Sequence, residues 1–334
     1  MFRELCMFNS ASGDEKSVRD YIIESIDGYC TYEVDSMGSI IAFKEGKRKA
    51  YKKIMLCAHM DEVAFVVTDI TDDGYLRFKS VGGVDPKTIC GRTVSINDID
   101  GVVGIKPIHL TSKEEEEKAP EYDDLFIDIG AKNKEEALEH IQLGDYAYFK
   151  SDFTDFGENC VLSKALDDRI GCMYLVELIR TFDLEFDTYF CFNVQEEIGG
   201  RGALCTSYSV NPDIAVVIEV TTANDIDGVT GSDKVCSLGD GPVVSYMDKY
   251  TIYDKYLYHL AMDTAKQNSI KAQTKTRIAG GNDAQSIQTT HGGTRVIAIS
   301  VPCRYIHSGS CVVNKDDIRE TRKLIRAFLP RIYD

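Results

Sequence analysis

The candidates for chemistry are polar side chains that directly follow apolar runs or open a helix. Ligands of open α/β sheets gather at the carboxyl ends of strands, so we expect these side chains at one edge of a sheet. They are His59 after IMLCA, Glu196 and Glu197 after YFCFNV, Glu219 after IAVVI, His307 shortly after VIAISVP, and Asp167 at the start of LDDRIGCMYLVELIRTF. Each alone is more often structural, but two imidazoles with three of these four carboxylates are the ligand set of paired Zn²⁺ or Co²⁺ ions.

One carboxylate shared between two ions explains the number of candidates. With Asp167 as the bridge, His59 and Glu219 hold one ion. Glu197 and His307 then hold the other. Two cations about 3.5 to 4 Å apart lower the pKa of a shared water and polarise a carbonyl, which suits hydrolysis of an amide. We therefore expect two divalent ions per subunit, Zn²⁺ or Co²⁺, with Mn²⁺ as a further candidate.

Two more carboxylates are expected to act beside the metal ligands. Glu196 and Glu197 are adjacent, so in an extended backbone their side chains diverge and cannot readily serve the same ion. One binds metal, while Glu196 takes a proton from the attacking water and passes it to the leaving amine. Asp61 lies two residues after His59, on the same side of an extended chain, where it can accept the other imidazole N–H.

The elements that position these residues alternate between helices and continuous apolar strands. This pattern predicts an α/β fold whose mixed sheet is covered by helices on both faces. From about 68 to 156 apolar and polar residues alternate in short segments such as YLRFKSV, which are separated by DDG and LGD turns. This pattern predicts an inserted β-rich domain. The catalytic domain is then discontinuous, at 1–67 and 157–334. Within the insertion we expect Asn133 to cap a short helix and the acidic run in 108–124 to be a solvated loop or helix.

Composition excludes several classes of function. The net charge of −16 argues against nucleic acid and anionic membranes as partners. No stretch approaches the ~20 apolar residues of a membrane span, and the N-terminus lacks a signal-peptide pattern, so we expect a soluble cytoplasmic protein. The 11 cysteines contain no CxxC pair and are expected to be reduced, mostly buried thiols.

Six ordered motifs resemble those of the glutamyl aminopeptidase family, which includes the tetrahedral aminopeptidases and members described as cellulase M. The motifs are AHMDEV at 58–63, KALDDRIG at 164–171, VQEEIGGRGA at 194–203, VIEVT at 217–221, GGNDAQSI at 280–287 and RYIHS at 304–308. The likeness runs nearly end to end and includes VGGVDP, GVVGIKP and DLFIDIGA in the insertion. Position 219 is usually Asp in the family, and SGSC at 308–311 also departs from its pattern.

The resemblance implies a metallo-aminopeptidase fold and the same residue roles. These are His59 and Glu219 on one metal, Asp167 as bridge, Glu197 and His307 on the other metal, Glu196 as base and Asp61 as support for His59. It further implies that short peptides are the substrates, and that the insertion is a dimerisation domain from which many members build hollow dodecamers. We therefore expect a homo-oligomer between a dimer and a dodecamer.

Two alternatives stay open from the sequence. A deacylase that releases N-acyl amino acids would use the same pair of ions. A peptide-binding protein with a decayed metal site would fit the departures at Glu219 and at 308–311. Glycoside hydrolysis is disfavoured, because the carboxylates accompany histidines and the chain has no tryptophan for sugar stacking.

Overall fold

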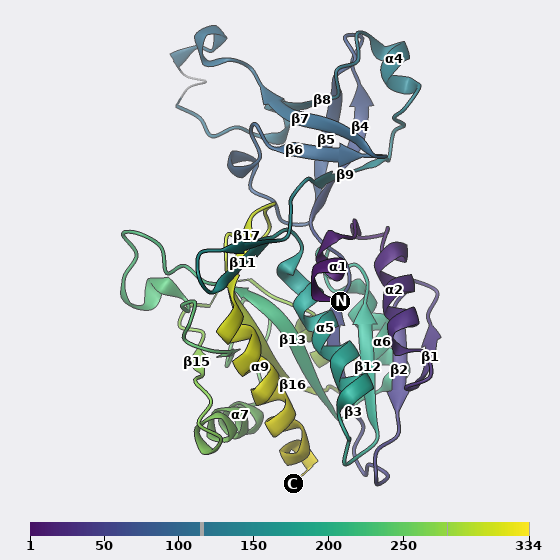
Figure 1. The fold of residues 1–334 in the computed structure, drawn as a ribbon, viewed down its shortest axis with the longest axis vertical. Helices are drawn as coiled ribbons and strands as arrows, with labels where there is room; N and C mark the ends of the chain where they lie inside the picture. The colour runs from purple at the N-terminus through teal and green to yellow at the C-terminus, as the bar shows by residue number, and fades with distance from the viewer. Residues whose placement is uncertain (114–116, 279, 334) are drawn as a thin grey trace.

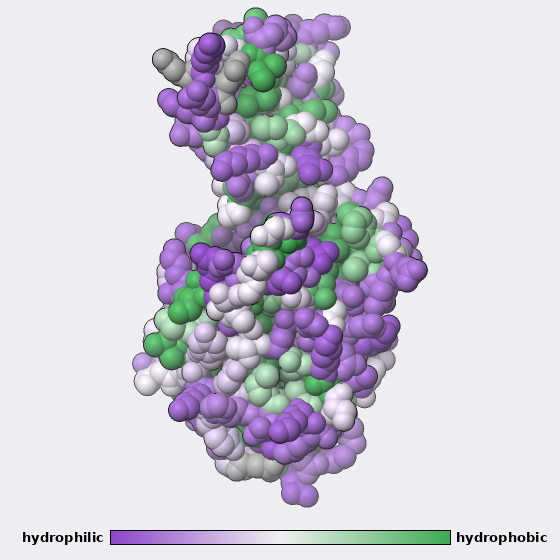
Figure 2. All heavy atoms as spheres, turned by 90° about the vertical axis from the view of Figure 1, so that its left-hand side faces the viewer, coloured by the Kyte–Doolittle hydropathy of each residue, from purple (hydrophilic) through white to green (hydrophobic). Residues whose placement is uncertain are grey.

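The computed structural model describes residues 1–113, 117–278 and 280–333. These residues form an 11-stranded mixed sheet with helices and a separate closed β-barrel, which confirms the predicted α/β class. The barrel stands at one end of the larger part, and the two meet at a narrow waist (Figures 1 and 2). Residues 114–116 of the acidic run lie outside the described residues.

Four parallel strands form the centre of the sheet. In spatial order they are β12 (Thr188–Asn193), β3 (Ile54–His59), β13 (Ile214–Thr222) and β16 (Arg295–Arg304). All residues of β3 are buried, as expected for an apolar run without alternation. Since the four strands run in the same direction, their carboxyl ends meet at one edge.

Antiparallel strands extend this centre on both sides. Beyond β12 lie β2 (Ile40–Lys44) and β1 (Thr31–Val34). Beyond β16 lie β17 (Cys311–Asn314), β11 (Cys160–Ser163) and β10 (Thr154–Phe156). Two short strands, β14 (Val243–Val244) and β15 (Gln273–Thr274), join at β16 through β14.

Side chains of β3 alternate between two apolar clusters, because successive residues of a strand point to opposite faces. Ile54, Leu56 and Ala58 enter the larger cluster, and Met55 and Cys57 enter the smaller one. The larger cluster contains residues of α1 (Phe2–Met7), α2 (Lys16–Ile26), α5 (Leu166–Thr181), α7 (Lys255–Gln267) and α9 (Lys315–Phe328), and the smaller contains residues of α6 (Arg201–Val210) and α8 (Ala284–Gln288). No helix in the described part of the chain is long and apolar enough to cross a membrane.

The barrel has its own apolar core and antiparallel neighbours throughout. Its strands follow the order β4 (Ala64–Ile70), β5 (Leu76–Val81), β8 (Leu125–Asp128), β7 (Ile99–Ile105), β6 (Thr93–Ile96) and β9 (Tyr146–Phe149). The predicted cap is confirmed at α4 (Lys134–Leu138), where Oδ1 of Asn133 accepts the N–H of Glu136 at 2.9 Å. Only residues 60–63 separate β3 from β4, so the barrel begins directly beside the ligand-rich edge.

Candidate metal centre

The carboxyl ends of the central strands bring the predicted residues together. His59 ends β3 and lies opposite Asn193, which ends β12. Glu196 and Glu197 follow β12, Glu219 lies in β13, and His307 follows β16, while Asp167 comes from the start of α5. The convergence of strand ends explains how side chains almost 250 residues apart reach one site.

Asp167 lies between the two histidines. Its Oδ1 is 3.4 Å from Nε2 of His59, and its Oδ2 is 3.4 Å from Nε2 of His307. Nε2 of His59 is also 3.5 Å from Oε1 of Glu219. Nε2 of His307 is 3.4 Å from Oε2 of Glu197. The five side chains therefore form two groups of three that share one carboxylate.

These separations fit ligands around a cation better than hydrogen bonds. An N–H···O bond usually spans about 2.7 to 3.2 Å. In a tetrahedral site with bonds of about 2.1 Å, neighbouring ligand atoms lie roughly 3.4 Å apart. Oδ1 of Asp167 is buried and has no hydrogen-bond partner among the described residues. Because an unpaired buried carboxylate oxygen is costly, the residues fit a divalent cation at this place.

The second nitrogen of each imidazole is held by a backbone carbonyl. Nδ1 of His59 is 3.0 Å from the carbonyl oxygen of Asp61 and 3.4 Å from its Oδ1. The sequence predicts the Asp61 carboxylate as the acceptor, and the carbonyl of the same residue lies closer. Nδ1 of His307 is 2.9 Å from the carbonyl oxygen of Gly83. A proton on Nδ1 leaves the Nε2 lone pair for a metal ion.

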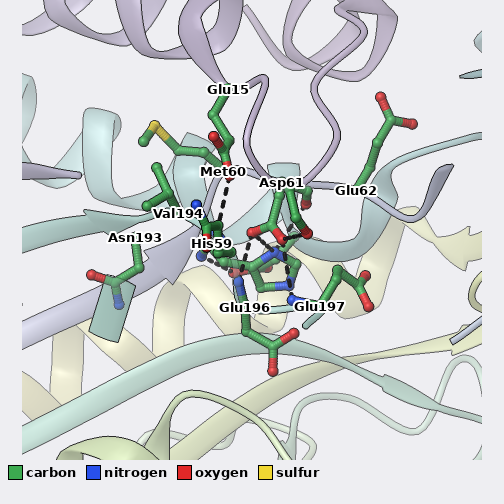
Figure 3. Close-up of polar contacts among 12 residues, drawn as sticks. Glu15, His59, Met60, Asp61, Glu62, Asn193, Val194, Glu196 and Glu197 are labelled. Carbon is green, nitrogen blue, oxygen red and sulfur yellow. Dashed lines mark hydrogen bonds and ion pairs between the residues drawn. The ribbon is translucent and has the colours of Figure 1, made fainter. Parts of the chain in front are cut away.

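The Asp61 carboxylate organises the turn after β12. Its Oδ1 accepts the N–H of Glu196 at 3.0 Å, and its Oδ2 accepts the N–H of Glu197 at 3.1 Å. Ser12 donates its hydroxyl to the same Oδ2 at 2.6 Å. Figure 3 shows Asp61 beside His59 with the two glutamate side chains pointing in different directions, as expected for adjacent residues.

Glu196 is half-buried and lines a cavity of about 170 Å³ together with His59, Asp167, Glu219 and His307. Burial raises the pKa of the Glu196 carboxyl well above its usual range, and the charge of Glu197 raises it further. A carboxyl group with a raised pKa beside a cavity is suited to proton transfer near neutral pH.

Three of the candidate ligand side chains have raised pKa values. Burial raises the pKa of Glu197 to about 7 and that of Glu219 to about 8. Burial lowers the pKa of His307, but the negative charges of Glu197 and Asp167 outweigh it and raise the pKa to about 10. A bound cation would have to displace the protons that these groups hold at neutral pH.

Asp168 is a site residue without a separate signal in the sequence. It is fully buried, its Oδ2 accepts the backbone N–H of His59 at 3.3 Å, and its Oδ1 accepts the N–H of Gly171 at 2.9 Å. A Cβ at position 171 would lie 2.2 Å from Oδ2 of Asp168, so glycine is required there. In the sequence, the only sign of this contact is the acidic pair of DDRIG with a glycine three residues after Asp168.

A ligand-rich strand edge on a mixed sheet, with a β-barrel attached beside it, is the architecture of metal-dependent aminopeptidases. The chain belongs to the M42 glutamyl aminopeptidase family, whose model matches residues 38–324. The family predicted from the motifs is thereby confirmed, and the protein is a metallo-aminopeptidase, a hydrolase of peptide bonds.

Similar proteins cover almost the whole chain. The lysyl aminopeptidase of Pyrococcus furiosus is 32% identical over 94% of this chain and 91% of its own length. The glutamyl aminopeptidase of Lactococcus lactis is 31% identical over 98% of this chain and 94% of its own. The structure of the TET1 peptidase of Pyrococcus horikoshii superposes with a TM-score of 0.85 and 35% identity, covering 97% of this chain and 96% of that one.

Proposed function

We propose that the protein is a dinuclear-metal aminopeptidase that removes N-terminal residues from short peptides in the cytoplasm. The observation that carries the proposal is the position of Asp167, with one carboxylate oxygen 3.4 Å from His59 and the other 3.4 Å from His307. One oxygen directed to each imidazole is the arrangement that a bridging carboxylate needs. A cytoplasmic location is supported by the cysteines, since all 11 are free thiols.

In this proposal each ion has three protein ligands. His59, Glu219 and Oδ1 of Asp167 would hold one ion. Glu197, His307 and Oδ2 of Asp167 would hold the other, and Zn²⁺, Co²⁺ or Mn²⁺ suits this donor set. When bound, the pair of ions lowers the pKa of a water molecule and polarises the peptide carbonyl.

Glu196 is proposed to carry the proton through the reaction. Its carboxylate takes a proton from water at the start and delivers it to the nitrogen of the departing peptide. Asp61 holds the backbone of Glu196 and Glu197 in place, so the base keeps its position when its own charge changes.

Two cavities meet at His307 and fit the two sides of a cleaved peptide. The cavity of about 170 Å³ is lined by Glu196 and by four of the five proposed ligands, namely His59, Asp167, Glu219 and His307. A second cavity of about 460 Å³ also borders His307, with Phe156, Leu162 and Val312 among its apolar lining residues. We assign the small cavity to the N-terminal residue and the large one to the residues that follow it.

The barrel is proposed to be the dimerisation domain, inserted at about 68–156, of a homo-oligomer. The similar TET1 peptidase assembles into a tetrahedron or an octahedral shell. Figure 2 shows hydrophobic side chains among hydrophilic ones on the barrel surface. Ile108 is 72% exposed and Leu110 is 61% exposed, and both lie in the barrel region. Light scattering of the purified protein should give a mass of at least two subunits.

The direct test of the activity uses a free peptide and its N-acetylated form. An aminopeptidase cleaves the first peptide bond only when the α-amino group is free, whereas a deacylase hydrolyses the N-acyl bond of the acylated form. We expect Glu196→Gln to lose about 10²- to 10⁴-fold in kcat while it keeps its metal content. Glu158→Gln, at an exposed position, is the matched control. Unchanged turnover in Glu196→Gln would refute the assignment of the base, and no bound metal would favour a decayed site.

A further inference from the structure

An arginine of the barrel lines the larger of the two cavities that border His307. Arg92 directly precedes β6, and it lines the cavity of about 460 Å³. Phe156 of β10 and Leu162 of β11 line the same cavity from the large sheet. The cavity is therefore shared by the barrel and the sheet, and it places a cation of the barrel in the same lining as a candidate metal ligand.

The backbone of Arg92 is fixed, while most of its guanidinium group is unused. Its N–H donates to the carbonyl of Ile89 at 3.0 Å, and its carbonyl accepts the N–H of Val103 at 2.9 Å. Its Nε donates to the carbonyl of Thr88 at 3.2 Å. Within the described residues, Nη1 and Nη2 have neither a hydrogen-bond partner nor an acid at ion-pair distance. Because their N–H groups lie in one plane, they can bind a carboxylate through two parallel hydrogen bonds.

Two hydroxyls and the acid of the lining are already used by the chain itself. The hydroxyl of Thr88 donates to the carbonyl of Asp85 at 2.8 Å, and that of Ser308 donates to the carbonyl of Tyr305 at 2.6 Å. The Asp85 carboxylate accepts the backbone N–H of Lys87 at 3.0 Å. Arg92 is the one arginine among the described lining residues, and no lysine accompanies it. It is therefore the group through which this cavity can bind an anion.

The rest of the cavity suits the end of a short peptide. Phe156 is 48% exposed and Tyr305 is 55% exposed, so both rings are open to contact with a ligand. A sphere of the same volume would be about 10 Å across, and an extended chain advances about 3.3 to 3.6 Å per residue. The cavity therefore takes up to about three residues that follow the cleaved bond.

We propose that Arg92 binds the free C-terminal carboxylate of the substrate and thereby favours very short peptides, from dipeptides to tetrapeptides. This inference rests on the proposed aminopeptidase function and specifies the length and the end group of its substrate. When the N-terminal residue lies in the small cavity, such a peptide ends in the large one, where its carboxylate meets the guanidinium group. A longer peptide, or one with an amidated end, offers no terminal anion there. Ser308 and Ser310 of the lining belong to the stretch 308–311 that departs from the family pattern, so family membership does not fix this cavity.

The test compares Ala-Leu, Ala-Leu-Gly and Ala-Leu-Gly-Gly with their C-terminal amides on the metal-loaded enzyme, by the initial release of alanine. Each pair shares the free α-amino group and the cleaved bond, and differs only in the charge of the end group. For at least one pair, the wild type should show a kcat/KM about tenfold higher with the acid, mainly through a lower KM, because the ion pair lies away from the reacting atoms.

Variants at position 92 assign this preference to the arginine. Arg92→Gln should lower kcat/KM for the preferred acid about tenfold and leave that for its amide within about twofold, because only the acid loses a charge-assisted hydrogen bond. Arg92→Lys should keep part of the preference, since it keeps the charge but loses the planar fork. Lys87→Gln is the matched control, because this exposed lysine of the same barrel segment lies outside the cavity lining, and it should change neither substrate.

Equal kcat/KM for acid and amide at all three lengths in the wild type would overturn the proposal. A preference for the acid that survives in Arg92→Gln would assign the carboxylate to another group, and a parallel fall with acid and amide would show that the arginine only supports the junction with the barrel. A long peptide that begins with Ala-Leu needs no variant, and cleavage as efficient as that of the best short acid would also contradict the role of Arg92. All these results leave the aminopeptidase function intact, since alanine is still released. No release from any peptide with Zn²⁺, Co²⁺ or Mn²⁺ would instead overturn the function itself.

Discussion

Oδ1 of Asp61 accepts the backbone N–H of Glu196 at 3.0 Å. This hydrogen bond joins the end of β3, where His59 lies, to the turn after β12 that carries the proposed base. Asp61 is fully buried, so water does not compete for the bond. Asp61 thus holds the candidate ligand His59 through its carbonyl oxygen and the backbone of the proposed base through its carboxylate.

Asp61→Asn should lower activity without removing the metals. The amide has one acceptor oxygen, so the N–H of either Glu196 or Glu197 loses its partner. We expect kcat to fall about 10- to 100-fold, the range seen when groups that orient metal ligands are changed. Steady-state kinetics with metal analysis tests this, and a normal kcat would contradict it.

Ser12→Ala should have a smaller effect in the same direction. It removes the 2.6 Å hydrogen bond to Oδ2 of Asp61 but leaves both glutamate N–H bonds. A loss of less than about tenfold in kcat is expected. Ser17→Ala is the matched control, because that exposed hydroxyl donates to the carbonyl of Asn9 at 2.8 Å, away from Asp61. Equal losses in both variants would mean that the N-terminal segment acts through stability alone.

Metal binding should release protons and weaken in acid. Without metal, burial raises the pKa of Glu197 to about 7 and of Glu219 to about 8, and nearby carboxylates raise that of His307 to about 10 despite its burial. These groups hold protons at pH 7 that a cation must displace, so affinity should rise roughly tenfold per pH unit for each proton released. Calorimetry in two buffers of different ionisation enthalpy counts the protons. A heat of binding independent of the buffer would rule this out.

Glu62 should be essential for stability rather than for chemistry. Its Oε1 is 2.6 Å from Nζ of Lys164 and 3.6 Å from Nη2 of Arg169, and all three side chains are buried. Glu62→Gln leaves two buried cations without their anion, which should lower the free energy of unfolding by about 3 to 5 kcal/mol. Glu185→Gln breaks the exposed pair with Arg48 and should cost at most about 1 kcal/mol. Chemical denaturation measures the free energy of unfolding of both variants. Similar losses in the two would contradict a stabilising role for the buried pair.

Gly82→Ala should disturb the junction between the barrel and the metal centre. Position 82 has φ of +88°, and a Cβ there would lie 2.8 Å from Cγ1 of Val63 and 3.2 Å from Cβ of Glu197. Gly91→Ala is the control, since its φ is +74° but its Cβ would meet nothing within 4 Å. Both variants pay backbone strain of about 1 to 3 kcal/mol, and only Gly82→Ala should also lower metal affinity. Equal metal affinities in the two variants would show that the barrel does not support the site.

Much of the fold follows from local patterns in the sequence. The run before His59 lacks alternation, and it forms a strand buried at every residue. Asn133 caps its helix because the capping preference acts within three residues. Ligands gather at strand ends in such sheets, and the five candidate ligands chosen on this basis do lie within a few ångströms of their neighbours in the structure.

Other contacts of the site join segments that are far apart in the sequence, so no local sequence pattern predicts them. The carbonyl of Gly83 holds His307 from a loop 224 residues away, and every residue has such a carbonyl. Ser12 reaches Asp61 only because the N-terminal segment folds over the strand end. Lys275 lines the small cavity directly after a strand of two residues, and so short a strand has no alternation that could predict it.

The central claim is that Asp167 bridges two cations. Anomalous diffraction at the zinc edge from crystals soaked in Zn²⁺ tests it most directly. We predict two peaks about 3.5 to 4 Å apart, one beside Nε2 of His59 and one beside Nε2 of His307, each about 2 Å from a different oxygen of Asp167. A single peak at full occupancy, or two peaks that Asp167 does not touch, would contradict the account.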